Sequence, residues 1–528
     1  MQAYIFSSFT GLPERYFQGY CFSGADYIFG EKGSLEYEGV TGKRIGPGLD
    51  GCYVSVGKEN DAYIIGGDYS GFKKIFYYQR DSIWCVSNSI ELIVRHMSAN
   101  GARLTCRSSQ IEAQKVASNI TTCQSTFKTI FNEVFLLPSY SFIKVDKGGL
   151  VVLRRSKGGR RAPYEEGLAV FLETWVSRFE TLLVDSRVKI GSQLTGGKDS
   201  RAVFAMLQRA RQRIGSKFFN NASVISGRSE KEPRDYEIAE LIANAHNIPI
   251  QGQSLGFLPK FTTEASYLSW RTLSLGLYNP IYFSNNKIDG SFVQFSGIGG
   301  ENHRPFYNFS GVEELLRSVR KVSSFYSGAW EGDLRETMAQ LLLNNPSSSP
   351  LIEHYREFRS RIHGGRTPQN LVCFPPLSGG LLENLLIEDK ARALGQVNFD
   401  IMESALPGLW DFDYDKPTKS PTLEHRAIVK RVPIRDEASP GGVYLSPSED
   451  SVAGGRIDPV QRMALLASDF AEAIEHPSVR SIMGAGTIKK CLDILGAAES
   501  AGKFNHAWDG QDITRTLTVA LALKYADH

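Results

Sequence analysis

The chain has 528 residues, of which 42% are hydrophobic and 22% charged, and a formal net charge of +3. This composition is ordinary for a soluble enzyme, and the length predicts two or more domains, each able to bury a core. The charge argues neither for nor against nucleic acid, but no basic, aromatic-rich strip supports such a partner, so none is expected. No apolar run approaches membrane-spanning length, and the N-terminus lacks the basic region and apolar core of a signal peptide. We therefore expect no membrane contact and a cytoplasmic location.

The seven cysteines are odd in number and include no C-x-x-C pair. This scatter favours reduced thiols over disulfides or a zinc site, and it agrees with the expected cytoplasmic location. The seven are Cys21, Cys52, Cys85, Cys106, Cys123, Cys373 and Cys491.

The first 155 residues are rich in aromatic and β-branched residues that alternate in short runs. Turn residues separate these runs, which predicts antiparallel hairpins. The runs are Cys52–Val56, Tyr63–Gly67, Lys74–Tyr78 and Ile83–Ser87. A basic stretch, Arg154–Pro163, is the best linker candidate, with a phosphate-binding role as the alternative. We expect a domain of residues 1–155 and a second of residues 164–528.

The second half of the chain alternates strand-like and helix-like segments. This alternation predicts an α/β domain whose parallel sheet is covered by helices and binds its ligand at the carboxyl ends of the strands. Gln193 and Gln294 fit a buried parallel strand poorly. The expected strands are Val188–Leu194, Ala222–Ser226, Ile248–Gln251 and Phe292–Phe295.

A glycine-containing loop, Leu194–Arg201, lies between the first of these strands and a helix. Gly196 and Gly197 allow the backbone to approach an anion, which the free N–H groups of the helix start would face. A carboxylate in such a loop repels phosphate unless a divalent cation separates them, so Asp199 predicts Mg²⁺. The loop does not fit the Walker A motif, because its lysine precedes an aspartate. The alternative is a plain glycine turn before a helix.

A second glycine-rich loop, Ser296–Asn302, follows the fourth expected strand and carries Glu301. Two such loops on strands of one sheet would face each other across a crevice. Asp199 and Glu301 would then hold Mg²⁺ against the two sides of a triphosphate.

Ordered matches from residue 49 to residue 302 resemble the class II asparagine synthetases and their relatives, β-lactam synthetase and the macrolactam cyclases of lasso peptides. The first loop resembles the S-G-G-x-D-S pyrophosphate loop, with Thr195 in place of the first serine, and the second resembles S-G-x-G-x-D-E. Further matching segments are Leu49–Gly51, Gly67–Tyr78, Ser87–Glu91, Leu136–Ser139, Ala222–Gly227 and Asp235–Ala239.

The resemblance implies an N-terminal Ntn-hydrolase-like antiparallel sandwich remnant and a pyrophosphate-loop (adenine nucleotide α-hydrolase-like) domain with a helical C-terminal region. It implies ATP and Mg²⁺ as cofactors, Asp199 and Glu301 as metal ligands and catalytic residues, and Arg304 as support for the leaving pyrophosphate. A catalytic lysine would be Lys416, with Lys419 as the other candidate, and the alternative for each is an ordinary surface lysine. The implied nucleotide-binding residues are Leu194, Thr195, Gly196, Gly197, Asp199, Ser200, Val224, Ser226, Ser296 and Gly297.

The glutaminase half departs from the family. Residue 2 is Gln2 where the family has its nucleophilic cysteine, and the oxyanion segment N-G-E-I-Y-N has no counterpart. Cys21 and Cys52 are expected to be core thiols. Ile298 stands where β-lactam synthetase has its catalytic tyrosine, which argues against the same base. The nitrogen should then come from an amine or free ammonia.

The expected function is an ATP-dependent amide-forming ligase without glutaminase activity, in bacterial specialised metabolism. Its partners would be a small-molecule or peptide carboxylate and an amine. Alternatives are a lasso peptide cyclase with a precursor peptide and companion protease, a non-catalytic scaffold, or RNA modification by another pyrophosphate-loop enzyme. Two further assignments stay open. His303 is a base or a capped surface histidine, and Arg361, His363 and Arg366 bind a substrate carboxylate or form a solvated helix end.

Overall fold

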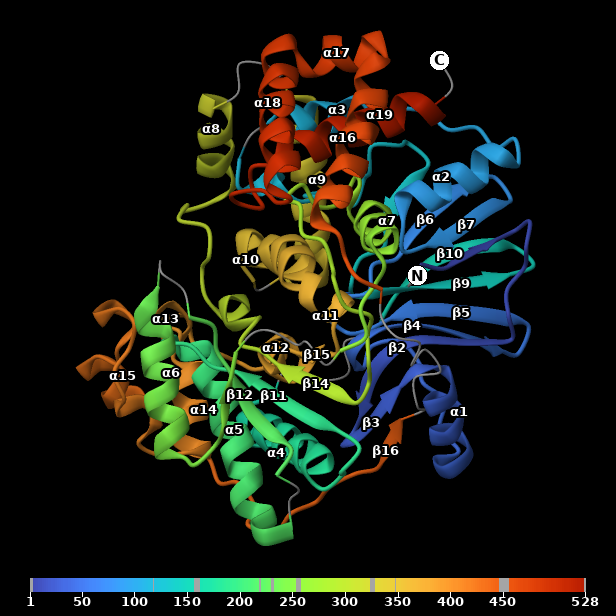
Figure 1. The fold of residues 1–528 in the computed structure, drawn as a ribbon. Helices are drawn as coiled ribbons and strands as arrows, with labels where there is room; N and C mark the ends of the chain where they lie inside the picture. Colours follow the sequence, from blue (N-terminus) through green and yellow to red (C-terminus); the bar gives the residue numbers. More distant parts are fainter. Residues whose placement is uncertain are drawn as a thin grey trace.

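The computed structural model describes residues 3–116, 118–155, 162–217, 220–228, 232–252, 258–322, 328–346, 348–445 and 455–526. Within these ranges the chain has a mixed α/β fold with antiparallel and parallel sheets and many helices (Figure 1). Gln2 and residues 156–161 of the expected linker lie outside them.

Two sheets pack face to face, and all their strands except β16 come from the first 155 residues. Val54 and Ile65 of one sheet share a core with Trp84 and Val86 of the other. The larger sheet has the order β10 (Gly149–Arg154), β9 (Ser141–Asp146), β5 (Ala62–Gly67), β4 (Asp50–Glu59), β2 (Arg15–Ser23), β3 (Asp26–Phe29) and β16 (Val443–Leu445). The smaller has the order β1 (Ile5–Ser7), β7 (Ile83–Ser87), β6 (Phe76–Arg80) and β8 (Val134–Leu136).

The predicted hairpins are confirmed, because β4 pairs antiparallel with β5 and β6 pairs antiparallel with β7. The first hairpin is tighter than the sequence indicates. Strand β4 continues through Glu59, so that the turn is confined to Asn60 and Asp61. Asn60 has a φ of 54°, a left-handed conformation that asparagine tolerates better than most residues.

A parallel sheet is formed by the second half of the chain, and the predicted alternation of strands and helices is confirmed. The sequence missed its fifth strand, which is only two residues long. Gln294 lies in the strand Phe292–Phe295 of this sheet and is buried despite its polarity. The spatial order is β13 (Ile250–Gln251), β12 (Ala222–Ile225), β11 (Lys189–Gln193), β14 (Phe292–Phe295) and β15 (Cys373–Phe374).

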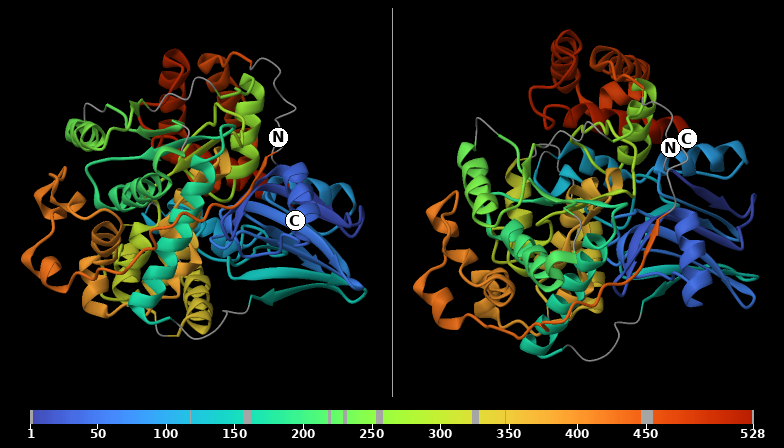
Figure 2. Two further views of the ribbon diagram at one scale, coloured as in Figure 1. Left: turned by 90° about the horizontal axis from the view of Figure 1, so that it is seen from below. Right: turned by 60° about the horizontal axis from the view of Figure 1, so that its bottom comes forward.

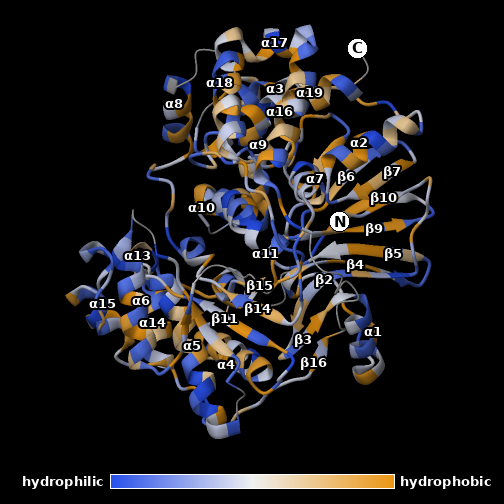
Figure 3. Ribbon diagram, viewed as in Figure 1, coloured by the Kyte–Doolittle hydropathy of each residue, from blue (hydrophilic) through white to orange (hydrophobic). Residues whose placement is uncertain are grey.

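Helices cover the parallel sheet and carry hydrophobic residues on one side and hydrophilic ones on another (Figure 3). Helix α4 is deeply buried, since Phe171, Trp175 and Phe179 are almost inaccessible. The helices of this layer and its extensions are α4 (Tyr164–Leu183), α5 (Lys198–Ile214), α6 (Pro233–Ala245), α12 (Gly380–Glu383), α13 (Asp389–Leu394), α14 (Val397–Ala405) and α15 (Leu423–Ile428).

The large antiparallel sheet and the parallel sheet share one core. The rings of Phe22 on β2 and Phe374 on β15 lie 4.5 Å apart, and Trp175 of α4 contacts both. The Tyr20 hydroxyl accepts a hydrogen bond of 2.9 Å from the Cys373 backbone N–H. These contacts fix the two sheets against each other.

Elements from late in the chain return to the first 155 residues. Strand β16 pairs parallel with β3 at the edge of the large sheet (Figures 1 and 2). Near the C-terminus, α19 packs on α2 and α3. The division into domains 1–155 and 164–528 remains a prediction, and these contacts cross it.

The remaining helices lie mainly on the N-terminal sheets and between the two halves. They are α1 (Gly30–Thr41), α2 (Ile90–Ala99), α3 (Ser108–Lys115), α7 (Thr263–Ser274), α8 (Val312–Val322), α9 (Ala329–Asn344), α10 (Pro350–His354), α11 (Arg366–Asn370), α16 (Pro459–Glu475), α17 (Pro477–Met483), α18 (Ala485–Ala501) and α19 (Gln511–Tyr525), with a π-helical segment η4 (Tyr355–Gly364) after α10. In the described part of the chain, no helix has both the length and the apolar character needed to cross a membrane. All seven cysteines are free thiols, as predicted.

Candidate functional site

The two glycine-rich loops meet at the carboxyl ends of β11 and β14. These strands are parallel neighbours, so their ends lie at one edge of the sheet. The loop after β11 leads into α5, and the loop after β14 leads into the 3-10 helix η3 (Gly300–His303). The sequence-based expectation that the loops face each other agrees with this arrangement.

Glycine is required where the loops touch. A Cβ at Gly297 would lie 2.7 Å from the Ser200 backbone nitrogen, and one at Gly300 would overlap the Asp199 carboxyl group. Any larger residue at either position would therefore push the second loop away from the start of α5.

Arg304 joins the acidic residues of the two loops. Its Nη2 donates to Asp199 Oδ2 at 3.2 Å and to Glu301 Oε1 at 3.1 Å. Burial raises the pKa of Asp199, and the Arg304 charge partly offsets that increase. The two carboxylates thus converge on one cationic group, at the place where the sequence predicts a magnesium ion.

Helix α14 supplies two further contacts that the sequence did not reveal. Asn398 Nδ2 donates to Asp199 Oδ1 at 2.6 Å, and the Lys198 ammonium lies 5.3 Å from the centre of the Phe399 ring. Burial, together with the nearby Arg304, lowers the pKa of Lys198 to about 8. The position of Lys198 before Asp199 was visible in the sequence, but nothing marked Asn398.

The start of α5 is free of side-chain caps. The N-cap residue is Gly197, which has no side chain that could accept a hydrogen bond from the first N–H groups of the helix. The Gly196 N–H donates to Asp235 Oδ1 at 2.9 Å, so this loop already holds one anionic oxygen. Ser200 Oγ accepts from the Thr195 N–H at 3.1 Å. The arrangement suits a phosphate-sized anion at the helix N-terminus.

The other expected nucleotide-binding residues lie in or next to the sheet. Leu194, Val224, Ser226 and Ser296 are all buried. The Ser296 hydroxyl accepts from the Cys373 thiol at 3.5 Å, so it faces β15. For Val224, a contact with a nucleotide would have to use the backbone, because its side chain is inaccessible.

The segment that contains the candidate lysines packs on the first loop. The Asp415 N–H donates to the Gly196 carbonyl at 3.3 Å. Arg201 holds the segment in place, with its guanidinium stacked 3.7 Å from the Tyr414 ring centre. Lys419 pairs with Asp415 at 2.6 Å, whereas Lys416 is exposed.

Two interpretations of the sequence are corrected by burial. His303 is not a surface histidine: it is 5% exposed and hydrogen-bonds the Leu377 carbonyl through Nε2 at 2.9 Å. Burial, reinforced by the Arg356 charge, lowers its pKa to about 3, so it is neutral at physiological pH.

The expected polar cluster of Arg361, His363 and Arg366 is neither a carboxylate site nor a solvated helix end. Arg361 is 2% exposed and donates to the Gly71 and Leu137 carbonyls at 2.9 Å each. His363 hydrogen-bonds the Tyr278 hydroxyl, and Arg366 stacks on Tyr282. The three side chains therefore engage different partners.

The donor set fits a magnesium ion that arrives with a phosphate ligand. Among the described residues, no group of three or more His, Cys, Asp or Glu side chains is placed to hold a metal. Mg²⁺ is, however, commonly held by one or two carboxylates, with phosphate oxygens and water completing its octahedron. Asp199 and Glu301 meet that requirement once Arg304 moves away from between them.

No family model matches the sequence, and no curated protein matches it. The chain shows a weak structural similarity to glutamine phosphoribosylpyrophosphate amidotransferase from B. subtilis, a structure complexed with ADP and GMP, with 10% sequence identity and a TM-score of 0.12. The match covers 52% of this chain and about half, 47%, of the amidotransferase chain. At that TM-score it supports no conclusion about fold or function.

Proposed function

We propose that this protein is an ATP-dependent carbon–nitrogen ligase of the asparagine synthetase type, acting in bacterial natural-product biosynthesis. It adenylates a substrate carboxylate, converts ATP to AMP and pyrophosphate, and transfers the acyl group to an amine without hydrolysing glutamine. On this proposal the N-terminal sandwich is a remnant of an Ntn-hydrolase-like glutaminase domain, and the parallel-sheet half is the pyrophosphate-loop domain. The enzyme acts in the cytoplasm.

One observation carries the proposal. Asp199 and Glu301, from loops on two neighbouring parallel strands, share one guanidinium nitrogen, and the uncapped start of α5 lies beside them. A plain glycine turn gives no reason for a second glycine loop to carry its carboxylate to the same point. Paired carboxylates next to an anion-binding helix start are what a magnesium triphosphate needs.

The residues would act in two stages. The free N–H groups at the start of α5 would hold the pyrophosphate portion while the substrate carboxylate attacks the α-phosphorus. Arg304, displaced from the carboxylates, would place its charge on the departing pyrophosphate. A magnesium ion held by Asp199 and Glu301 would supply charge neutralisation. Lys416 would then face the acyl carbon as the amine attacks and AMP leaves.

The environment of Cys21 and Cys52, in the N-terminal sandwich, supports the absence of glutamine hydrolysis. Cys21 and Cys52 are buried, and burial raises the pKa of both thiols well above the usual value. A thiol is a nucleophile only as the thiolate, so neither can replace the family's N-terminal cysteine.

Pyrophosphate release tests the proposal directly. The protein would be incubated with ATP, Mg²⁺ and pools of carboxylic acids, with and without added amines, and pyrophosphate and AMP would be measured. Release that depends on an acid supports the ligase. The complete absence of release, together with no binding of ATP, would instead favour a non-catalytic scaffold. A lasso peptide cyclase is the alternative ligase, and a linear precursor peptide that becomes cyclic in the assay would identify it.

A further inference from the structure

Arg304 occupies the position between the two acidic loops that a divalent cation would need. Its Nη2 atom lies 3.2 Å from Asp199 Oδ2 and 3.1 Å from Glu301 Oε1, so one nitrogen contacts both proposed metal ligands. A magnesium ion sits about 2.0–2.1 Å from each of its ligand oxygens. A guanidinium nitrogen and a metal ion cannot share the space between these two oxygens, because they would overlap and both are positive. Each therefore excludes the other.

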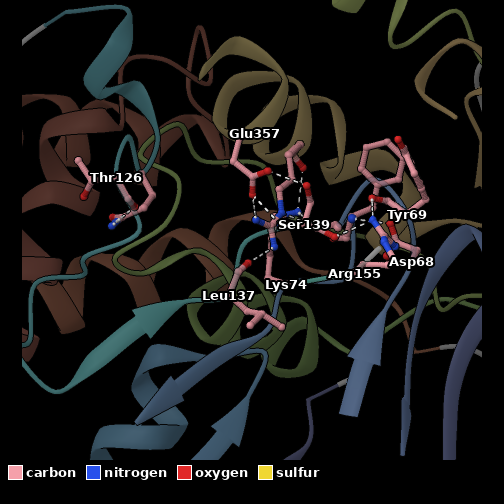
Figure 4. Close-up of polar contacts among 12 residues, drawn as sticks. Asp68, Tyr69, Lys74, Thr126, Leu137, Ser139, Arg155 and Glu357 are labelled. Atoms are coloured by element: carbon pink, nitrogen blue, oxygen red, sulfur yellow. Dashed lines mark hydrogen bonds and ion pairs between the residues drawn. The ribbon is translucent and has the colours of Figure 1, made fainter. Parts of the chain in front are cut away.

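The attachment of Arg304 is weaker than that of an arginine with a purely structural role. Within the described part of the chain, Nη2 is the only Arg304 side-chain nitrogen that donates a hydrogen bond. Arg361 instead uses three nitrogens: Nε and Nη2 donate to the Gly71 and Leu137 carbonyls at 2.9 Å each, and Nη1 pairs with Glu357 (Figure 4). Arg304 lacks the two-pronged contact that makes an arginine–carboxylate pair strong. Its guanidinium can leave by releasing a single nitrogen.

A second cation, Lys198, lies close to Arg304. A Cβ on Gly395 would lie 2.6 Å from Lys198 Nζ and 3.7 Å from Arg304 Cδ, so both side chains pass the same glycine turn. Lys198 donates to the Leu394 carbonyl at 3.3 Å, a neutral acceptor that leaves its charge in place.

The charges of the site balance when no ligand is bound. The carboxylates of Asp199 and Glu301 are matched by the cationic groups of Arg304 and Lys198. A free divalent cation would add positive charge that nothing in the site neutralises. A magnesium triphosphate carries net negative charge, and its phosphate oxygens would give both cations new partners. The balance therefore favours a metal that arrives together with phosphate.

We propose that Arg304 is a gate, which keeps free divalent cations out of the site and moves aside for a cation bound to a nucleoside triphosphate. Without a ligand, its charge relieves the repulsion between the Asp199 and Glu301 carboxylates. With the ligand, the metal takes over that task and Arg304 turns to the phosphates. This inference rests on the metal position of the proposed function, but not on its ligase chemistry.

Binding of Mn²⁺ tests the gate without any turnover, because the free ion has an electron paramagnetic resonance signal that is lost on binding. Without nucleotide, Arg304→Met should bind Mn²⁺ about tenfold or more tightly than the unaltered full-length protein, because it keeps both carboxylates and loses the competing charge. A non-hydrolysable ATP analogue should increase the Mn²⁺ affinity of the unaltered protein. Equal affinities of the two proteins without nucleotide, or no gain from the analogue, overturn the proposal.

Further variants locate the effect. Arg335 also joins two carboxylates, since its Nη2 donates to Glu313 at 2.9 Å and to Glu331 at 2.7 Å. Arg335→Met should leave the Mn²⁺ affinity unchanged, because Arg320 still pairs with Glu331 there. Adding Asp199→Asn to Arg304→Met should remove the gain in affinity, and a gain that survives this change overturns the proposal.

Two controls keep the outcome clear. If Arg304→Met does not fold, Arg304→Gln, which retains a neutral donor for the carboxylates, should also bind Mn²⁺ more tightly than the unaltered protein. Pyrophosphate release by the unaltered protein is measured in parallel. Release together with equal Mn²⁺ affinities rejects the gate and leaves the ligase standing. The expected difference in affinity without any release supports the gate and rejects the ligase.

Discussion

Asn398 reaches Asp199 from a helix that lies far along the chain, and its side-chain amide donates to the carboxylate at 2.6 Å. Arg304 holds the other oxygen of the same carboxylate. With both oxygens engaged, the Asp199 side chain has one orientation before any ligand arrives. For Asp199 to hold the proposed metal, Arg304 would have to leave Oδ2, while the Asn398 contact would keep the carboxylate oriented.

Removal of either acidic residue should stop the reaction. Asp199→Asn and Glu301→Gln should each lower pyrophosphate release by about a hundredfold or more, because each removes an anionic metal ligand while preserving shape. Circular dichroism should show an intact fold. Near-normal turnover in either variant would show that the metal is held elsewhere.

Asn398 should act by positioning Asp199. Asn398→Ala should lower pyrophosphate release by roughly tenfold and raise the Mg²⁺ concentration needed for half-maximal rate, because residues that orient metal ligands have effects of this size. Asn100→Ala, at an exposed helix end, is the matched control. A rate loss that excess Mg²⁺ leaves unchanged in Asn398→Ala would argue for a role other than orientation.

The two candidate lysines should respond differently. Lys416 is exposed, whereas the Lys419 ammonium is engaged by Asp415. Lys416→Ala should slow amide formation more than it weakens ATP binding, measured as separate effects on kcat and on KM for ATP. If Lys416→Ala is as fast as the unaltered protein and Lys419→Ala is slow, the role belongs to Lys419.

Glutamine should not serve as nitrogen source. The purified protein should release no glutamate from glutamine above background, with or without ATP, and a glutamine-directed affinity label should leave all seven cysteines unmodified. Amide product should contain nitrogen from added amine or ammonium when glutamine is absent. ATP-coupled release of glutamate would mean that another nucleophile has replaced the lost cysteine.

Lys74 should make stability depend on pH. Its ammonium donates to the Gly71, Phe72 and Arg361 carbonyls in a fully buried site, where burial and the Arg361 charge lower its pKa from 10.5 to about 7. Between these values the unfolded chain binds the proton and the folded protein does not, so the free energy of unfolding should rise with pH.

The matching variant separates this contribution from other titrations. Lys74→Met leaves three buried carbonyls without a donor but also removes the cost of burying a charge, so it should lower the free energy of unfolding more at pH 10 than at pH 7. It should also flatten the rise between pH 7 and 10.5. Lys58→Met, at a surface lysine whose side chain is 43% exposed, should change stability by less than about 0.5 kcal/mol. Denaturant titrations at several pH values measure both, and an equal slope for Lys74→Met and the unaltered protein would contradict the assignment.

The parts of the site that follow directly from strand ends could be predicted from the sequence. The loop containing Asp199 and the loop containing Glu301 each follow a strand, and parallel strands bring their carboxyl ends to one edge. Asn398 could not be predicted, since it is an ordinary polar residue whose contact with Asp199 depends on how its helix packs.

The burial of individual polar side chains could not be predicted from the sequence either. His303 follows a glycine loop and resembles an exposed residue in sequence, but the Leu377 carbonyl gives it a buried partner. In the sequence Arg361 resembles a residue at a solvated helix end. In the structure it donates hydrogen bonds to two backbone carbonyls and forms an ion pair with Glu357. Local pattern does not show the carbonyl partners of these two residues, because those carbonyls lie more than seventy residues away in the sequence.

Strand β16 also affects how the chain folds during synthesis. Tyr444 and its neighbours pair with β3, so this edge of the large sheet has no partner until about residue 445 has left the ribosome. At roughly 5–20 residues per second that interval lasts tens of seconds. Through it the nascent chain exposes an open strand edge, which other chains can pair with. Fragments that end before Val443 should therefore aggregate, even though they contain every other strand of that sheet.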